Sequence, residues 1–266
     1  MSARLDEFLL SSGRFKSRTC AKAAVMAGLV SVDGCFSVKP GTRVKGTEDI
    51  QILSGGSGFV SRGGEKLDGA LDDLGIDVTG MTAIDVGAST GGFTDCLLQR
   101  GAVRVIALDV GKGQLEWKLR CDERVDVIEE FNARYLKPQD LKGKRPDIAT
   151  VDVSFISLLK VIAPVFGVLD DGAFALGLVK PQFEAGRSDA RGGVVRDARV
   201  HLDVLKKAKE GLEELGLSMR AVVPSRLKGP KGNVEFFSLI AKEFGGADMR
   251  ALEAAVAAAH PTGESV

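Results

Sequence analysis

Short apolar runs alternate with amphipathic stretches along the chain from about residue 80 onward. Such runs are typical of strands that are buried on both faces of a sheet. An amphipathic helix is expected over 197–215, because its apolar residues share one face and Gly216 follows. The alternation predicts an α/β fold with helices on both faces of a parallel sheet. The expected strands are 81–86, 103–109, 125–128, 148–151, 173–179, 222–223 and 234–240.

The first sixty residues have a different pattern, which predicts two short helices and a small sheet. Apolar residues at helical spacing mark the helices, and Ser12-Gly13 separates them. The expected elements are helices near 5–9 and 20–27, a strand at 29–32, a tight turn at 33–34, and a second strand through 36–38 and Val44.

A Ser/Gly run over 54–58 indicates a hinge, since such residues neither pack nor favour one backbone conformation. We therefore expect a small domain over 1–60, a linker over 54–62 and a large domain over 63–244. The Ala-rich tail, 245–266, is expected to be partly helical or disordered.

Charge is distributed unevenly over these domains. The whole chain has 36 Lys and Arg against 36 Asp and Glu, which argues against a uniformly basic nucleic-acid binder. Between Arg4 and Arg62, however, nine basic residues face five acidic ones, a net charge of +4. The small domain is therefore basic and the remainder slightly acidic.

The apolar runs are too short to span a membrane, and the N-terminus lacks the pattern of a standard secretion signal. The four cysteines lack the pair spacing of metal sites, so we expect reduced, structural thiols. These features favour a cytoplasmic protein without a membrane partner. His201 and His260 have no partners at ligand or triad spacing, and no metal site is expected.

A glycine-rich turn follows the strand that ends at Val86, and a helical pattern follows the turn. This order is typical of a nucleotide site. Ser89 replaces the glycine that lets a backbone approach a pyrophosphate, which favours a ligand such as S-adenosylmethionine. Asp109, at the end of the next strand, is expected to bind ribose hydroxyls. The candidate cofactor-binding residues are Asp85, Gly87, Ser89, Thr90, Gly91, Gly92, Phe93, Thr94, Asp109 and Asn132.

Two lysines and two acids are candidates for catalysis. Asp152 and Lys180 each end a predicted strand, so they are expected at the sheet edge beside the donor. Lys66 follows the linker, and Glu235 interrupts an apolar strand. A hydroxyl group is too weak an acid to attack a methyl donor unaided, so methyl transfer to a hydroxyl needs a base or a cation. We interpret Lys180 as the base and Lys66 as the group that positions substrate or stabilises the alkoxide.

The N-terminal pattern resembles the S4 RNA-binding domain. The resemblance rests on Arg4-Leu5-Asp6, Ser17-Arg18, the stretch 28–34 and Lys39-Pro40-Gly41. It implies that cations near the second helix bind RNA phosphates. The segment 182–199 adds arginines beside the expected base. The candidate RNA-binding residues are Arg4, Arg14, Lys16, Ser17, Arg18, Lys22, Arg62, Arg187 and Arg191.

The order Lys66, Asp152, Lys180, Glu235 resembles the catalytic tetrad of FtsJ-like ribose 2′-O-methyltransferases. Together with the stretches 61–67 and 179–184, the chain to about residue 240 resembles the TlyA family, historically called hemolysin A. The resemblance implies a Rossmann-like methyltransferase with a mixed seven-stranded sheet and a small S4-like α+β domain. It also implies S-adenosylmethionine as donor and cytidine in ribosomal RNA, free or within a ribosomal subunit, as substrate.

Three other readings remain open on the sequence. A non-catalytic S4-type assembly factor would not need both the donor turn and all four tetrad residues. A pore-forming hemolysin would need an apolar or strongly amphipathic membrane segment, which the chain lacks. A small-molecule O-methyltransferase would leave the basic N-terminal domain unexplained.

Overall fold

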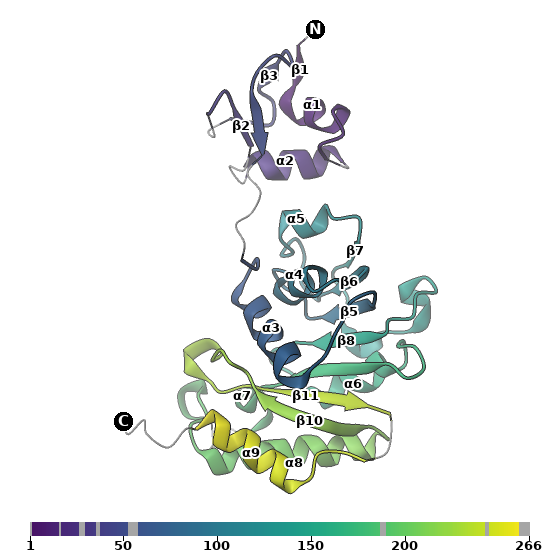
Figure 1. The fold of residues 1–266 in the computed structure, drawn as a ribbon, viewed down its shortest axis with the longest axis vertical. Helices are drawn as coiled ribbons and strands as arrows, with labels where there is room; N and C mark the ends of the chain where they lie inside the picture. The colour runs from purple at the N-terminus through teal and green to yellow at the C-terminus, as the bar shows by residue number, and fades with distance from the viewer. Residues whose placement is uncertain are drawn as a thin grey trace. The chain divides into compact units, whose positions relative to one another are not determined.

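The computed structural model describes residues 2–15, 17–26, 30–35, 38–52, 58–186, 190–242 and 245–260. The chain divides into two compact units (Figure 1). The N-terminal unit is Met1–Gly58 together with Leu115–Val125, and the second unit is Phe59–Gln114 with Asp126–Val266. The sequence did not lead us to expect that the N-terminal unit includes a segment from the later part of the chain.

The N-terminal unit contains two packed helices and two small antiparallel sheets. Its second sheet differs from the expected hairpin: Val30 pairs with Ile52 and Val32 with Ile50, and Val32 makes one isolated bridge to Cys35. Residues 36–37 of the expected return strand lie outside the described residues. The elements are β1 (Ala3–Arg4), α1 (Leu5–Ser11), α2 (Arg18–Met26), β2 (Val30–Val32), β3 (Arg43–Val44), β4 (Ile50–Ile52) and α5 (Trp117–Arg120).

The inserted segment completes the core of the N-terminal unit. Trp117 packs against this core, and its ring lies 5.8 Å from that of Phe15. Cys121 forms a disulfide with Cys20 of α2. The expectation of four reduced thiols is therefore wrong for this pair. The two cysteines are 101 residues apart, so local spacing could not reveal their contact.

The second unit is built on a seven-stranded mixed sheet in the order β10-β11-β9-β8-β5-β6-β7. The strands β6, β5, β8 and β9 are parallel, while β11 is antiparallel to both β9 and β10. The strands are β5 (Thr82–Val86), β6 (Arg104–Leu108), β7 (Val125–Ile128), β8 (Ile148–Val151), β9 (Phe174–Val179), β10 (Ser218–Pro224) and β11 (Phe236–Ala241). The predicted α/β class is confirmed.

Helices cover both faces of this sheet because its buried strands are apolar on both sides. In β5, Ile84 and Val86 belong to the large core, whereas Asp85 between them bonds to Thr94 of α4. The α-helices are α3 (Arg62–Leu74), α4 (Gly92–Gln99), α6 (Leu159–Phe166), α7 (Pro181–Glu184), α8 (Ala198–Glu214) and α9 (Met249–Ala259). Short 3₁₀ helices are η1 (Ala133–Tyr135), η2 (Pro138–Leu141), η3 (Arg191–Gly193) and η4 (Pro230–Gly232).

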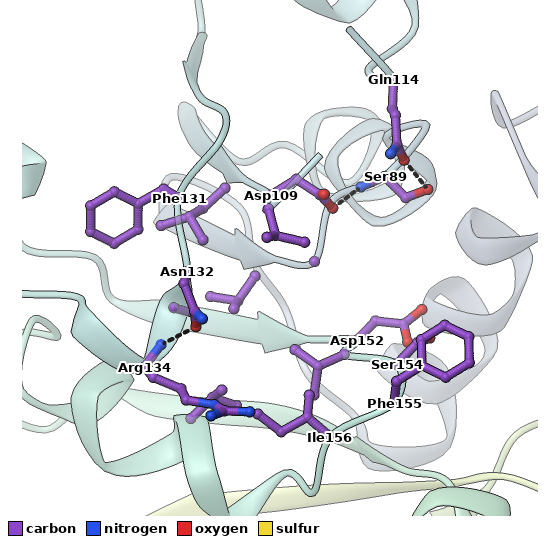
Figure 2. A pocket seen from close by; sticks show the side chains of 17 residues that line it. Ser89, Asp109, Gln114, Phe131, Asn132, Arg134, Asp152, Ser154, Phe155 and Ile156 are labelled. Carbon is purple, nitrogen blue, oxygen red and sulfur yellow. Dashed lines mark hydrogen bonds between the residues drawn. The ribbon is translucent and has the colours of Figure 1, made fainter. Parts of the chain in front are cut away.

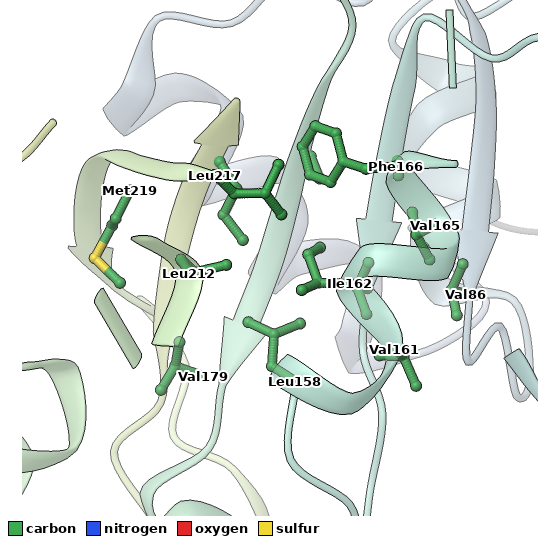
Figure 3. Packing of buried hydrophobic residues seen from close by; sticks show 14 of the residues in the cluster. Val86, Leu158, Val161, Ile162, Val165, Phe166, Val179, Leu212, Leu217 and Met219 are labelled. Atoms are coloured by element: carbon green, nitrogen blue, oxygen red, sulfur yellow. The ribbon is translucent and has the colours of Figure 1, made fainter. Parts of the chain in front are cut away.

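The large core lies between the sheet and the helices α6, α8 and α9. Figure 3 shows α6 side chains, Ile162 and Phe166 among them, packed with Leu212 of α8 and Val179 of β9. The tail contributes to this core, since Leu252 of α9 is fully buried in it. The described part of the tail is therefore helical and packed; residues 261–266 lie outside the described residues.

Candidate active site

Polar side chains collect at one edge of the large sheet, where the parallel strands end. Asp109 follows β6, Asp152 follows β8 and Lys180 follows β9. The strand β11 runs the other way, and its first residue, Phe236, pairs with Val179 at the end of β9. Glu235 therefore lies at the same edge. In open α/β sheets, ligands bind at the edge where the parallel strands end.

The glycine turn after β5 shapes this edge. Gly87 has a left-handed φ of 87°, and a Cβ there would lie 2.2 Å from the backbone oxygen of Asp152. A side chain at this position would thus separate the ends of β5 and β8. The turn also holds Ser89 at φ 49° before α4 begins. This backbone leaves room for a ligand beside the strand ends.

A cavity of about 500 Å³, the donor cavity, opens beside the turn (Figure 2). Asp109 is fixed in its wall: its two carboxylate oxygens accept hydrogen bonds from the backbone N–H groups of Ser89 (2.8 Å) and Gly111 (2.6 Å). Gln114 accepts a bond from the Ser89 hydroxyl at 3.3 Å. Asn132 also lines the cavity, although its side-chain oxygen accepts the backbone N–H of Arg134.

Three of the predicted cofactor-binding residues do not line a cavity at this edge: Asp85, Gly91 and Thr94. Asp85 is fully buried beneath the turn and accepts hydrogen bonds from Thr94 (2.7 Å) and Thr150 (3.0 Å). Burial raises the pKa of Asp85 to about 6, against the bonds from the two hydroxyls. Its observed contacts support the turn from below. The remaining predicted residues, Gly87, Ser89, Thr90, Gly92, Phe93, Asp109 and Asn132, line one or both cavities.

All four candidate catalytic residues line a second cavity of about 390 Å³, the tetrad cavity. It shares Gly87, Ser89 and Asp152 with the donor cavity, so the two adjoin. The side chains form two ion pairs. Lys66 of α3 bonds to Glu235 at 2.6 Å, and Lys180 pairs with Asp152. The sequence-predicted residues from four distant parts of the chain thus meet in one place.

Each ion pair has a neutral polar neighbour that the sequence did not reveal. The Lys180 ammonium donates to the hydroxyl of Ser154 at 3.1 Å. The Gln182 amide donates to the other oxygen of Glu235, also at 3.1 Å. The neutral group therefore contacts the lysine in one pair and the carboxylate in the other. Ser154 lies two residues after Asp152 and Gln182 two after Lys180, so proximity to a strand end was the signal that could have identified them.

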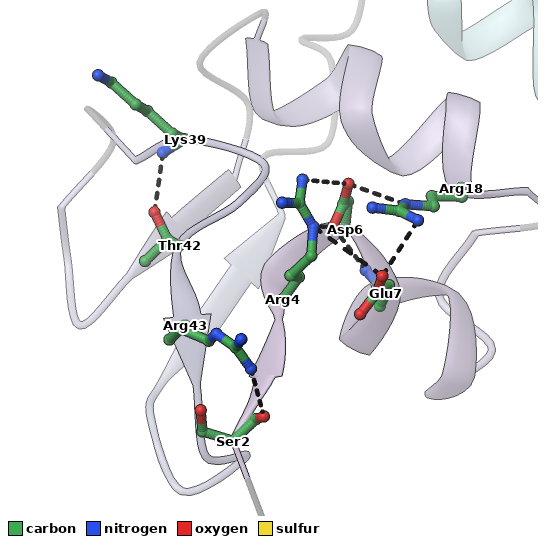
Figure 4. A network of polar contacts seen from close by, with 8 residues as sticks. All are labelled: Ser2, Arg4, Asp6, Glu7, Arg18, Lys39, Thr42 and Arg43. Atoms are coloured by element: carbon green, nitrogen blue, oxygen red, sulfur yellow. Dashed lines mark hydrogen bonds and ion pairs between the residues drawn. The ribbon is translucent and has the colours of Figure 1, made fainter.

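Predicted RNA-binding residues of the N-terminal unit already bond to protein atoms (Figure 4). Asp6, which is buried, accepts bonds from Arg4 and Arg18, and the bond from Arg4 lowers its pKa. Arg14 donates to the backbone oxygen of Ile50, and the Ser17 hydroxyl accepts the N–H of Cys20. The side chains of Arg4 and Arg18 remain 41% and 50% exposed, which leaves surface for a phosphate. Lys22 is exposed.

The other predicted RNA-binding residues divide into two groups. Arg62 lines the tetrad cavity and donates to the backbone oxygen of Lys228 at 3.0 Å. Lys16 and Arg187 lie outside the described residues, as does the side chain of Arg191.

No cluster of His, Cys, Asp and Glu suited to a metal ion occurs within the described ranges. His201 and His260, to which no catalytic role was given, contact each other through their ring nitrogens at 2.8 Å. Among the same residues, no helix is long and apolar enough to cross a membrane.

The mixed seven-stranded sheet and the glycine turn at its edge define the fold of S-adenosylmethionine-dependent methyltransferases. A family model described as FtsJ-like methyltransferase matches residues 59–242, and the chain belongs to that family.

Within it, the chain is a member of the TlyA/hemolysin A group. It is 44% identical over 237 residues to the 16S/23S rRNA (cytidine-2′-O)-methyltransferase TlyA of Mycobacterium tuberculosis, covering 88% of each chain. It is 41% identical over 236 residues to hemolysin A of Brachyspira hyodysenteriae, covering 88% of this chain and 98% of that protein. A solved structure of a candidate hemolysin from Streptococcus thermophilus superposes with a TM-score of 0.74 at 39% identity, covering 97% of this chain and 96% of that one.

Proposed function

We propose that this protein transfers a methyl group from S-adenosylmethionine to the ribose 2′-hydroxyl of cytidine in ribosomal RNA. One observation carries the proposal: Lys66, Asp152, Lys180 and Glu235 converge on a cavity that adjoins the donor cavity. The name of the Mycobacterium tuberculosis relative supports the choice of cytidine and ribosomal RNA.

The donor cavity suits S-adenosylmethionine. Asp109, whose carboxylate is held by two backbone N–H groups, retains lone pairs that can accept ribose hydroxyls. The glycine turn, where no side chain fits at Gly87, leaves space for the amino-acid part. When bound, the sulfonium supplies an electrophilic methyl group.

The tetrad cavity suits an RNA hydroxyl. In the reaction, an oxygen–methyl bond forms, the sulfur–methyl bond breaks and its electron pair stays on sulfur. Lys180 first releases a proton to solvent; as a neutral amine it then accepts the hydroxyl proton at Nζ, and Asp152 orients that amine. Lys66, held by Glu235, keeps a positive charge near the developing negative charge on oxygen. Both lysines are 9% exposed, so little water competes with these contacts.

The test is methylation by the purified protein. Ribosomal RNA and ribosomal subunits from a strain without the gene are incubated with methyl-labelled donor, and nucleosides are resolved by mass spectrometry. The expected product is 2′-O-methylcytidine. A methylated base, or no RNA product with any of these substrates, contradicts the proposal. Small-molecule acceptors are incubated in parallel to test whether the protein is instead a small-molecule O-methyltransferase.

A further inference from the structure

The tetrad cavity is lined by more cationic side chains than carboxylates. It is lined by four cationic side chains, Arg62, Lys66, Lys180 and Lys228, and by two carboxylates, Asp152 and Glu235. The two carboxylates pair with Lys66 and Lys180. Neither Arg62 nor Lys228 forms an ion pair with any residue that the structure describes. The formal excess of two positive charges therefore belongs to Arg62 and Lys228.

These two residues are held beside each other. Arg62, at the start of α3, donates to the backbone oxygen of Lys228 at 3.0 Å. The next residue, Gly229, packs so closely on Glu235 that a Cβ would lie 2.1 Å from its carboxylate oxygen. The backbone N–H of Gly229 also bonds to the oxygen of Asn233 at 2.8 Å. The loop between β10 and β11 thus has a defined backbone where it carries Lys228.

A second contact fixes the same loop to the other end of α3. Arg226 bonds to Asp73 at 2.6 Å, and its side chain packs over Gly69, where a Cβ would lie 2.6 Å from the Arg226 Cδ. The loop is therefore attached to the helix that carries Lys66. The side chain of Lys228 itself is exposed and lines the cavity. A cation on a fixed backbone with an exposed side chain is suited to binding an anion from solution.

We propose that Arg62 and Lys228 form a phosphate subsite for the linkage that follows the methylated ribose. This inference rests on the proposed function. In RNA, atoms C2′, C3′ and O3′ connect the 2′-oxygen to the next phosphorus, so this phosphate must lie close to an oxygen placed at Lys180. Lys180 and Lys228 line the same cavity. The acceptor is then a nucleotide within a polynucleotide, and a free nucleoside or 3′-terminal residue lacks the group that the subsite binds.

The carboxylate of the donor's amino-acid part has the same charge and similar acceptor oxygens. In the proposed binding mode it too would lie near the glycine turn, whose residues Gly87 and Ser89 line both cavities. The experiment must therefore measure RNA binding and donor binding separately.

The test compares Lys228→Met with Lys242→Met as a matched control. Lys242 is an exposed lysine just after β11, at the end of that strand opposite Glu235. Binding of unmodified ribosomal RNA to the full-length protein is measured at several KCl concentrations. Loss of one phosphate contact is expected to reduce the slope of log K against log salt by roughly 0.7 to 0.9. Lys242→Met should leave the slope unchanged, and Lys228→Arg should restore it. Calorimetry should show unchanged donor affinity.

Two results overturn the subsite. A weaker donor affinity with an unchanged salt slope in Lys228→Met would assign Lys228 to the donor carboxylate. Unchanged values for both ligands would leave Lys228 without a binding role. Because binding is measured without turnover, failure of the subsite is distinguishable from failure of the proposed reaction. Urea denaturation of each variant confirms that it is folded.

Discussion

The two lysine–carboxylate pairs of the tetrad cavity differ in their surroundings. In the pair of Lys66 and Glu235, the side chains are 11% and 0% exposed, and Gln182 donates to the carboxylate. In the pair of Lys180 and Asp152, the acid is 25% exposed, and Ser154 accepts from the lysine. The first pair is closed and links α3 to the residue just before β11. The second is open to solvent at its acid.

This difference indicates that the two pairs have different roles. The Glu235 carboxylate accepts bonds from both Lys66 and Gln182, so it fixes the position of the Lys66 side chain. A hydroxyl beside Lys180 can accept from an ammonium and donate to a neutral amine, so it suits both protonation states. The closed pair should therefore matter most for stability and the open pair most for turnover.

The largest effect is expected for Lys180→Ala. Loss of the base should lower the rate of methyl transfer by roughly 10²- to 10⁴-fold, while donor affinity stays unchanged. Labelled-methyl incorporation and calorimetry measure the two quantities, with Lys242→Ala as the control. Near-normal turnover in Lys180→Ala would show that another group takes the proton.

Lys66→Met should have the largest effect on stability. Removing one member of a buried pair leaves the other charge uncompensated, which costs about 3–5 kcal/mol of unfolding free energy. Asp152→Asn, at a partly exposed position, should cost about 1 kcal/mol or less. Urea denaturation measures both. The double variant Lys66→Met/Glu235→Leu, which replaces both partners, should recover stability but not activity. Equal losses of unfolding free energy in Lys66→Met and Asp152→Asn would remove the distinction between the pairs.

Another carboxylate near this edge, Asp85, is buried and accepts hydrogen bonds from two hydroxyls, and no cation among the described residues pairs with it. Its folded-state pKa of about 6 lies above the ordinary value of 3.8. Its contribution to stability is therefore present below about pH 4 and is lost as pH rises through about 6, a change on the order of 3 kcal/mol. Asp85→Asn should gain stability relative to the native protein over that range.

Urea denaturation of the native protein and Asp85→Asn at acid and neutral pH measures this difference. His201, whose pKa burial lowers to about 4, titrates in both proteins and cancels in the comparison. A difference between the two proteins that does not change with pH would mean that folding does not raise the pKa of Asp85.

The smallest effects concern the neutral neighbours. Gln182→Leu removes a bond to a buried carboxylate and should lower the unfolding free energy by about 1–3 kcal/mol. Ser154→Ala, at an exposed position, should change it by about 0.5 kcal/mol or less. The same denaturation experiment checks both. A larger loss for Ser154→Ala would reverse the assignment of closed and open pairs.

Much of this edge followed from the sequence because strand ends are local features. The apolar runs before Asp109, Asp152 and Lys180 predicted where each residue would lie, and the helix predicted at 197–215 is α8. Contacts between distant segments were not accessible in this way. The pairing of β2 with β4 and the Cys20–Cys121 bond depend on how the whole unit packs.

Local reasoning also overextended to three residues that line neither cavity, Asp85, Gly91 and Thr94, and it missed others. Asp85 is on the expected strand, yet its side chain bonds to Thr94 of α4 beneath the turn. The sequence around Asp85 did not show which face of the sheet its side chain would lie on. Lys228 escaped attention because a basic, glycine-rich loop is usually a solvated turn. Its position becomes meaningful once Gly229 is seen against Glu235.

The segment Leu115–Val125 belongs to the N-terminal unit, although β5 and β6 of the second unit precede it in the chain. During synthesis, the helices α1 and α2 emerge long before Trp117 and Cys121, which complete their core. The N-terminal unit, whose first residues are synthesised first, therefore has a complete core only after β5 and β6 of the second unit have been synthesised. A ribosome that stalls before residue 115 would carry an N-terminal unit whose apolar core is still open to other proteins.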